Sequence, residues 1–240
     1  MSNCLIVLPT YNEAENISEL IPRIFKYLPE TSVLVVDDGS PDGTAEMAKL
    51  LRSHFPKLEV INQGIKGGLG SAYRAGFAWG LSRNFDELIE MDADMSHRVR
   101  DLVNLIEAKS KSGAQLVIGS RWISGGQILN WSKDRELLSR FANRYVRTLL
   151  DLRIKDATSG FRVYDAQLLR SINLSLIRSE GYAFQIEMTR AARKAGAKIV
   201  EVPITFRERK NGASKMSRAI VVEAIFLVTI WGLKRIIKIK

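Results

Sequence analysis

The first 120 residues alternate between short apolar runs and longer segments with helical spacing, and this alternation restricts the possible folds most. The apolar runs, rich in Val, Ile and Leu, cover residues 4–9, 32–37, 58–62, 87–92 and 114–120. Between them, apolar residues recur at helical intervals in segments 13–28, 44–54, 70–83 and 98–112. Strands that alternate with helices need crossover connections, so the pattern predicts an α/β fold with a mostly parallel central sheet flanked by helices.

The second half of the chain departs from this alternation. Its spacing predicts helices at 134–150, 166–172, 182–195 and 217–238, and one strand at 198–206. No proline- or glycine-rich linker separates the two halves. We therefore expect residues 1–216 to form one domain, with residues 217–240 as a C-terminal helix that belongs to the same unit.

The C-terminal segment "AIVVEAIFLVTIWGLKRIIKIK" has two interpretations. Glu223 interrupts its apolar stretch, which is shorter than the ~20 residues that span a bilayer. It can be a buried core helix. Alternatively, it lies on an anionic membrane, because Trp231 is followed by four cations, Lys234, Arg235, Lys238 and Lys240.

The charge balance favours anionic partners. The chain has 36 Lys and Arg against 26 Asp and Glu, a formal charge of +10, which suits nucleic acid, an anionic membrane or phosphate-bearing small molecules. Nucleic acid is disfavoured because there is no basic stripe with interleaved aromatic residues. The only cysteine, Cys4, cannot form an internal disulfide, and the first residues lack the pattern of a secretion signal. We expect a cytoplasmic protein.

Acidic residues follow two of the predicted strands, where the loops meet at the carboxyl edge of a parallel sheet. In "MDADMSH", Asp92 and Asp94 can face a common divalent cation such as Mg²⁺, or they can cap the next helix together with Ser96. In "VVDDGSPDGT", Asp42 or Thr44 is suited to cap a helix, whereas a carboxylate of the Asp37–Asp38 pair could accept hydrogen bonds from a nucleobase or ribose.

Two further sets of residues bear on phosphate binding. The glycines of "KGGLGSAYRAG" match neither a P-loop nor a dinucleotide fingerprint, so we interpret them as a tight turn into a helix. Arginine suits bidentate phosphate contacts, and the candidate cations are Arg121 at a strand end, Arg135, the one-face series Arg140, Arg144 and Arg147, and the late-loop residues Arg207, Arg209, Lys210 and Lys215.

Taken together, the motifs resemble those of a known enzyme family. "LPTYNEAENI", "VVDDGSPDGT", "GGLGSAYRAG", "MDADMSH", "GSR", "SGFRVY" and "ITFRERKNGASK" occur here in the order seen in dolichyl-phosphate (polyprenyl-phosphate) mannose synthases, which are inverting family 2 glycosyltransferases. The resemblance runs from Leu8 to about Lys215. It implies a GT-A nucleotide-sugar fold, a catalytic domain at 1–216, and transfer of mannose from GDP-mannose to a dolichyl or polyprenyl phosphate.

The resemblance also implies roles for individual residues. Pro9, Tyr11, Glu13, Val36 and Asp38 would hold guanosine, and Asp92, Ala93 and Asp94 would form the motif that binds Mg²⁺ or Mn²⁺ at the diphosphate. Arg121, Arg209 and Lys215 would contact phosphates, and Arg135 and Arg140 are acceptor-side candidates. Asp94 and Arg121 would be the catalytic residues. Some members have glutamine where this chain has Ser96, which leaves the third metal ligand open.

The nucleophile decides whether a catalytic base is needed. Related enzymes often supply an aspartate from a Glu-Asp pair in the second half; here "SEGYAFQIEM" offers Glu180 and Glu187 instead. A lipid monophosphate is already an oxyanion, with its second pKa around 6, so it needs orientation more than deprotonation.

Two alternatives remain at this stage: a polyprenyl-phosphate glucose or N-acetylhexosamine synthase, and a basic nucleic-acid-binding protein. Because the chain ends at Lys240, it resembles members bound peripherally to the cytoplasmic membrane face.

Overall fold

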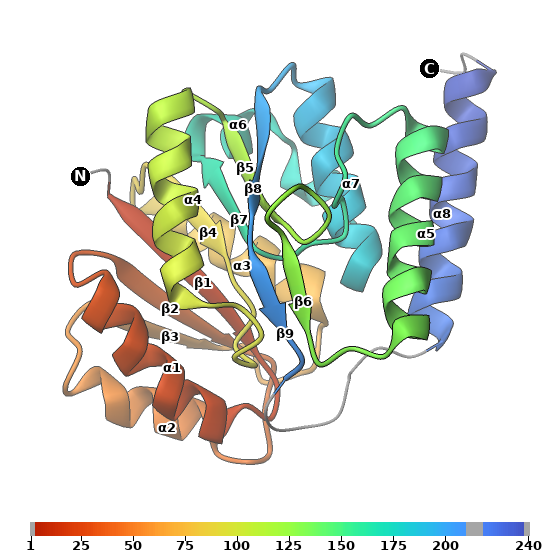
Figure 1. The fold of residues 1–240 in the computed structure, drawn as a ribbon. Helices are drawn as coiled ribbons and strands as arrows, with labels where there is room; N and C mark the ends of the chain where they lie inside the picture. The colour runs from red at the N-terminus through yellow and green to blue at the C-terminus, as the bar shows by residue number, and fades with distance from the viewer. Residues whose placement is uncertain (1–2, 210–217, 238–240) are drawn as a thin grey trace.

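A computed structural model describes residues 3–209 and 218–237. Figure 1 shows their arrangement. The first half contains β1 (Cys4–Thr10), α1 (Ala14–Tyr27), β2 (Ser32–Asp37), α2 (Thr44–Arg52), β3 (Leu58–Asn62), α3 (Leu69–Ser82), β4 (Glu87–Glu90), α4 (Val99–Ser112) and β5 (Leu116–Ser120). The second half contains β6 (Gln127–Leu129), α5 (Lys133–Leu150), β7 (Arg162–Asp165), α6 (Ala166–Ser171), the 3₁₀ helix η1 (Leu174–Leu176), α7 (Gly181–Lys194), β8 (Ile199–Pro203), β9 (Thr205–Arg207) and α8 (Arg218–Ile236).

Seven strands form the central sheet in the order β3-β2-β1-β4-β7-β5-β8. Within it, β7 runs antiparallel to both β4 and β5, and the other neighbouring strands pair in parallel. The predicted α/β fold with a mostly parallel sheet is therefore confirmed. A separate two-stranded sheet joins β6 to β9.

Two features of the second half differ from the prediction. The segment "RVYD" forms β7, although its polar ends, Arg162 and Asp165, hide it from a search for apolar runs. The strand expected at 198–206 is divided at Ile204: β8 continues the central sheet beside β5, and β9 pairs with β6 instead.

The strands alternate their side chains between two apolar layers, as the pleat of a strand requires. In β1, Leu5 and Val7 pack with α3 on one face, while Ile6 and Leu8 pack with α1 and α4 on the other. All four side chains are fully buried. Burial on both faces explains why the first strands are uninterrupted apolar runs.

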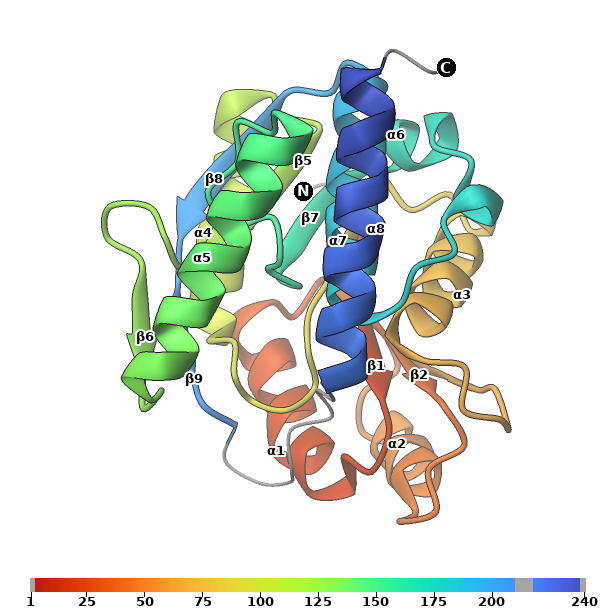
Figure 2. The same ribbon diagram turned by 90° about the vertical axis from the view of Figure 1, so that its right-hand side faces the viewer.

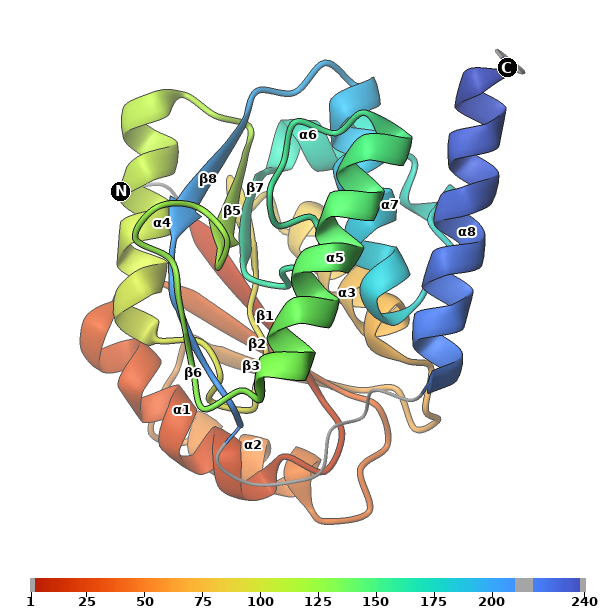
Figure 3. The ribbon, with the colours of Figure 1, turned by 45° about the vertical axis from the view of Figure 1, so that its right-hand side comes forward.

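The long helices α5 and α8 form an outer layer over α7, as Figures 2 and 3 show. Ala224 and Val228 of α8 are buried, but this helix also exposes a series of large apolar side chains, Val222, Ile225, Phe226, Leu233 and Ile236. It is therefore only in part the buried core helix that was one of the two interpretations. No helix within 3–209 or 218–237 combines the length and apolar character needed to cross a bilayer.

Candidate active site

The Asp92–Asp94 turn follows directly after β4 and is held by its own backbone. Met95 adopts a left-handed conformation with φ 64°, and the Ser96 amide donates to Asp94 Oδ1 at 3.1 Å. The other oxygen, Asp94 Oδ2, lies 3.2 Å from Nη2 of Arg209. Asp94 is only 7% exposed. The turn thus brings Arg209, one of the predicted phosphate contacts, directly to the predicted metal motif.

His97 is a site residue that the sequence interpretation missed. Its Nε2 lies 3.3 Å from Asp92 Oδ2. The ring is buried between Phe161, on which it stacks at a centroid distance of 4.5 Å, and Phe206, whose ring lies edge-on at 5.3 Å. Neither ring nitrogen has a hydrogen-bond partner among the described residues, so His97 approaches Asp92 without a formed hydrogen bond. The only signal in the sequence was the position of this histidine, five residues after Asp92.

The two carboxylates suit a hard divalent cation that is shared with a substrate. No group of three or more His, Cys, Asp and Glu in the described residues is placed to hold a metal by itself. Mg²⁺ typically takes one or two protein carboxylates and completes its shell with water and substrate phosphates. Asp92 and Asp94 fit that pattern. Ser96 Oγ is buried and has no hydrogen-bond partner among the described residues, so it is not committed elsewhere.

Asp37 and Asp38 both organise the loops beside this turn. Asp37 is fully buried and accepts hydrogen bonds from Thr10 Oγ1 at 2.9 Å and from the Ser40 amide at 2.9 Å. Asp38, 5% exposed, accepts from the amides of Gly67 and Gly68 at 3.1 and 2.7 Å. These bonds mean that the predicted nucleoside contact of Asp38 can use only its remaining lone pairs.

The glycine loop is a structural turn in the described chain. Two of its amides are bound by Asp38, and a third, that of Gly70, donates to Glu180 Oε2 at 2.6 Å. Glu180 also pairs with Arg74 at 2.9 Å. With these N–H groups occupied by carboxylates, the loop is not arranged as a phosphate cradle, which agrees with its interpretation as a tight turn into α3.

The remaining predicted guanosine residues lie at the ends of β1 and β2. Pro9 and Val36 are partners in the parallel register of these strands. The half-buried Tyr11 ring has the Lys66 ammonium 4.0 Å from its centroid, and Glu13, 7% exposed, accepts from Asn16 Nδ2 at 2.6 Å. The structure therefore gathers the predicted set at one place, although each member also has a contact within the protein.

Arg121 is anchored by a buried ion pair that the sequence did not reveal. Its Nε and Nη2 donate to the two oxygens of Asp156, each at 2.7 Å, and Nη2 also donates to Thr158 Oγ1 at 2.9 Å. Arg121 is 6% exposed and Asp156 is fully buried. Burial lowers the pKa of Arg121, but the Asp156 carboxylate more than offsets this and raises the net pKa. Arg121 is thus a fixed cation.

A second buried arginine, Arg162, holds the segment 156–159, which contains Asp156 and Thr158. Arg162, fully buried, donates to the carbonyls of Ala157 and Ser159 at 2.8 and 2.6 Å. Its Nε lies 4.0 Å from Glu90. Burial raises the pKa of Glu90 to about 7 against the lowering effect of Arg162. The arginine of "SGFRVY" therefore orders the 156–159 segment, and does not face a ligand.

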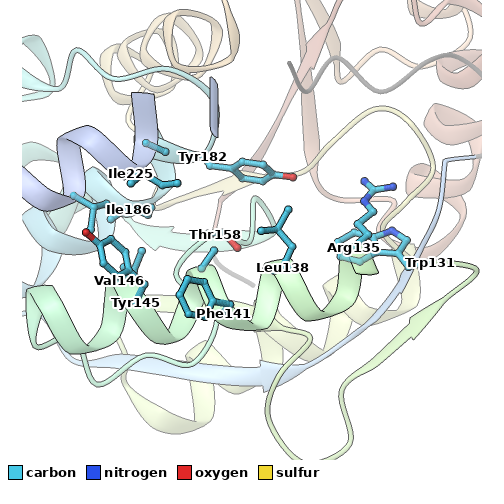
Figure 4. A pocket seen from close by; sticks show the side chains of 14 residues that line it. Trp131, Arg135, Leu138, Phe141, Tyr145, Val146, Thr158, Tyr182, Ile186 and Ile225 are labelled. Carbon is cyan, nitrogen blue, oxygen red and sulfur yellow. The ribbon is translucent and has the colours of Figure 1, made fainter. Parts of the chain in front are cut away.

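An apolar groove of about 290 Å³ opens between α5 and α8, with α7 beneath. Figure 4 shows its lining: Trp131 and Arg135 lie at one end, the hydroxyl of Tyr182 points along the groove toward Arg135, Thr158 lies near the middle, and the hydroxyl of Tyr145 lies at the opposite end. The other lining residues are mostly apolar, among them Leu138, Phe141, Val146, Ile186, Ala224, Ile225 and Val228. The groove is thus mainly apolar, with the Arg135 cation at one end.

Two lining residues connect the groove with the predicted site residues. Thr158 lines the groove and also binds Arg121. Burial raises the pKa of Tyr182. The charges of Arg121, Arg135, Asp92 and Arg209 also act on this pKa. Arg135 stacks 4.1 Å from the Trp131 ring and pairs with Glu208 at 2.7 Å. Tyr182 thus lies within electrostatic range of four predicted residues, Arg121, Arg135, Arg209 and Asp92, and Arg209 links this group to Asp94.

Several predicted cations are not part of this arrangement. Lys210 and Lys215 lie outside the described residues, and Arg144 and Arg147 line a different pocket together with Arg140. Arg140 does not line the groove; its guanidinium lies 4.3 Å from the Trp122 ring and its Nη2 pairs with Glu136 at 2.8 Å. Arg140 faces a different pocket, so the structure does not bring it to the groove as an acceptor-side residue.

The order of the strands in the sheet, the carboxylate turn and the arginines near it define a nucleotide-sugar transferase of the GT-A type. Residues 5–172 match the sequence model of "Glycosyl transferase family 2", and the chain belongs to that family. It is 48% identical over 229 residues to the undecaprenyl-phosphate mannosyltransferase of Micrococcus luteus, covering 95% of this chain and 93% of that protein. It is 47% identical over 231 residues to the polyprenol monophosphomannose synthase of Mycolicibacterium smegmatis, covering 96% and 87%.

Solved structures show the same fold at low sequence identity. Glucosyl-3-phosphoglycerate synthase from Mycobacterium tuberculosis, in complex with Mn²⁺, UDP-glucose and phosphoglyceric acid, superposes with a TM-score of 0.70 at 20% identity, covering 96% of this chain and 80% of that one. Residues 1–349 of TarS from S. aureus give a TM-score of 0.66 at 19% identity, covering 95% and 65%. The GT-A fold expected from the sequence is confirmed.

Breaking the Arg121–Asp156 pair should destabilise the protein strongly. Asp156→Asn leaves the Arg121 cation buried without its counter-charge, and we expect the free energy of unfolding to fall by about 3–5 kcal/mol. Urea denaturation of the wild type, Asp156→Asn, Arg121→Gln and the double variant measures both the loss and the coupling between the residues. Asp134→Asn, exposed at the start of α5, is the charge-matched control. A loss no larger than that of the control would contradict the structural role.

Proposed function

We propose that the protein transfers mannose from GDP-mannose to a polyprenyl or dolichyl phosphate with inversion, giving lipid-phosphate-linked mannose and GDP. The named relatives support the reaction class. The observation that carries the proposal is the apolar groove with Arg135 at one end, in which Thr158 also binds Arg121 and Tyr182 lies within electrostatic range of Asp92. A phosphate on a long apolar chain matches both parts of that groove.

On the donor side, the residues at the ends of β1, β2 and β4 bind the nucleotide sugar. Asp92 and Asp94 hold Mg²⁺ or Mn²⁺, which when bound neutralises charge on the diphosphate. His97 lies beside Asp92. Arg209 lies 3.2 Å from Asp94, so its guanidinium is close enough to the carboxylate turn to contact the diphosphate oxygens as well.

On the acceptor side, the lipid phosphate lies at the Arg135 end of the groove. Arg121 and Arg135 supply fixed positive charge there. An oxygen of the lipid phosphate attacks C1 of mannose, the bond from C1 to the GDP oxygen breaks, and the electron pair leaves with GDP. No proton has to be removed from the nucleophile, because a monophosphate with a second pKa of about 6 is ionised at neutral pH. Orientation and charge neutralisation are what the protein must provide.

The acceptor is a membrane lipid, so the protein works at a membrane surface. We propose that it sits peripherally on the cytoplasmic face. The exposed apolar side chains of α8, with Lys234 and Arg235 near its end, support this placement, because exposed apolar residues next to cations are typical of helices that lie on anionic bilayers.

Asp94→Asn is expected to reduce transfer by about 100-fold or more, because one of the two carboxylates for the metal is removed. The measurement is incorporation of label from radiolabelled GDP-mannose into the organic phase, with polyprenyl phosphate and Mg²⁺ or Mn²⁺. Glu107→Gln on α4, an exposed partner of Lys111, removes the same charge away from the turn and should keep wild-type activity.

The same assay tests the function itself. No labelled lipid from the wild type with GDP-mannose would contradict the proposed reaction, and UDP-glucose and UDP-N-acetylglucosamine in parallel would identify a different donor. An Asp94→Asn variant with normal activity and normal metal dependence would contradict the role of the turn.

The groove predicts a selective effect on the lipid. Leu138 and Ile225 line it and are 54% and 51% exposed, so their replacement by serine should leave the fold intact. Loss of these apolar contacts should raise KM for polyprenyl phosphate about tenfold, with kcat and KM for GDP-mannose unchanged. Steady-state kinetics with each substrate varied in turn measures this, and a Leu50→Ser/Tyr27→Ser variant on α1 and α2 is the matched control. An equal rise of both KM values would contradict the assignment.

A further inference from the structure

A second pocket lies on the opposite face of α5 from the groove. Its volume is about 190 Å³, and it is lined by Trp122, Arg140, Asn143, Arg144, Arg147 and Lys155. It shares no lining residue with the groove, and nothing in the proposed transfer reaction uses it.

Four of the six lining residues are cations, and only one of them has a carboxylate partner within ion-pair distance in the described part of the chain. Arg140 pairs with Glu136 at 2.8 Å. Within the described part of the chain, no carboxylate lies within ion-pair distance of Arg144, Arg147 or Lys155. All three side chains are exposed. Several like charges around one small concavity repel each other, and a bound anion would relieve that repulsion.

The shape of the pocket favours a phosphate group. Arg144 and Arg147 are three residues apart on α5 and so project from the same side of the helix as Arg140. Lys155 reaches the pocket from the segment after α5, and Trp122, beneath the Arg140 guanidinium at 4.3 Å, comes from the end of β5. Guanidinium groups converging from one helix suit the tetrahedral oxygens of a phosphate.

The neighbouring surface of α5 is apolar, which distinguishes a lipid from a soluble phosphate. Leu137 and Phe141 are 69% and 66% exposed. At 100° per residue they follow directly after the Arg140–Arg144 side on the helix surface: Leu137 lies between that side and the groove, and Phe141 lies at the edge of the groove, which it also lines. Basic and apolar side chains thus form adjacent stripes along α5, the pattern of a helix that lies in a membrane interface. Figure 2 shows α5 and α8 side by side in the same outer layer.

We propose that this basic pocket binds the phosphate of an anionic phospholipid headgroup and thereby fixes α5 on the membrane, with Leu137 and Phe141 entering the acyl boundary. This inference rests on the membrane contact in the proposed function, and it adds a specific site. With the Leu137 side of α5 on the interface, the basic pocket and the groove flank the line of contact on opposite sides of the helix.

The test is binding to vesicles of phosphatidylcholine with and without phosphatidylglycerol, measured by co-sedimentation of the full-length protein. Arg144→Gln/Arg147→Gln should lower affinity for the anionic vesicles by roughly 10- to 30-fold, at about 1 kcal/mol per interfacial cation. The control variant Lys26→Gln/Lys49→Gln, on α1 and α2, makes the same change in net charge at the far side of the molecule. It should lower the affinity for the anionic vesicles by less than threefold. Transfer to a short-chain, detergent-free acceptor should be unchanged in the Arg144→Gln/Arg147→Gln variant.

The vesicle and transfer measurements lead to different conclusions. If the two double variants weaken vesicle binding equally, binding depends on net charge alone and the pocket proposal is wrong. If Arg144→Gln/Arg147→Gln leaves vesicle binding intact but raises KM for GDP-mannose, the pocket serves a soluble ligand, which also overturns it. Absence of transfer activity in the wild type would instead contradict the proposed function, and the vesicle comparison would still stand.

Discussion

The arrangement depends on two carboxylates, Asp92 and Asp94, that follow β4 at the carboxyl edge of the sheet. Each has a positive or polarisable partner from elsewhere in the chain: Arg209 for Asp94 and His97 for Asp92. The β9 segment is fastened to this turn by a backbone bridge between His97 and Phe206 and by a bond from the Arg207 amide to the Ser96 carbonyl at 3.0 Å. Charge neutralisation therefore joins the late basic segment to the metal motif.

Helix α5 separates two environments, an apolar groove and a basic pocket. Its inner face closes the groove with α8, and its outer face carries the basic pocket and the apolar stripe. Asn143 lies on the boundary and is tied to Thr158 at 3.0 Å, and Thr158 in turn binds Arg121. A single helix is thus connected to the fixed cation of the site and presents the surface through which the protein would meet the membrane.

The sequence predicted the elements whose signal is local. Uninterrupted apolar strands and amphipathic helices were recognisable because burial imposes their period, and Asp92 and Asp94 were recognisable because of their place after a strand. What it could not predict depends on distant partners. Asp156 lies 35 residues from Arg121, and nothing local marks it. Arg162 was part of a family motif but proved to be a buried structural residue, and β7 was hidden because its pairing with β4 and β5, more than its composition, makes it a strand.

We expect a divalent cation and a nucleoside diphosphate to bind together at Asp92 and Asp94. Calorimetric titration of the wild-type protein with GDP, in Mn²⁺ and then in excess EDTA, measures this most directly. The account predicts binding in Mn²⁺ that EDTA weakens by at least about tenfold, since the protein alone offers the ion too few ligands. GDP binding of equal strength in both conditions, or no binding in either, would contradict it.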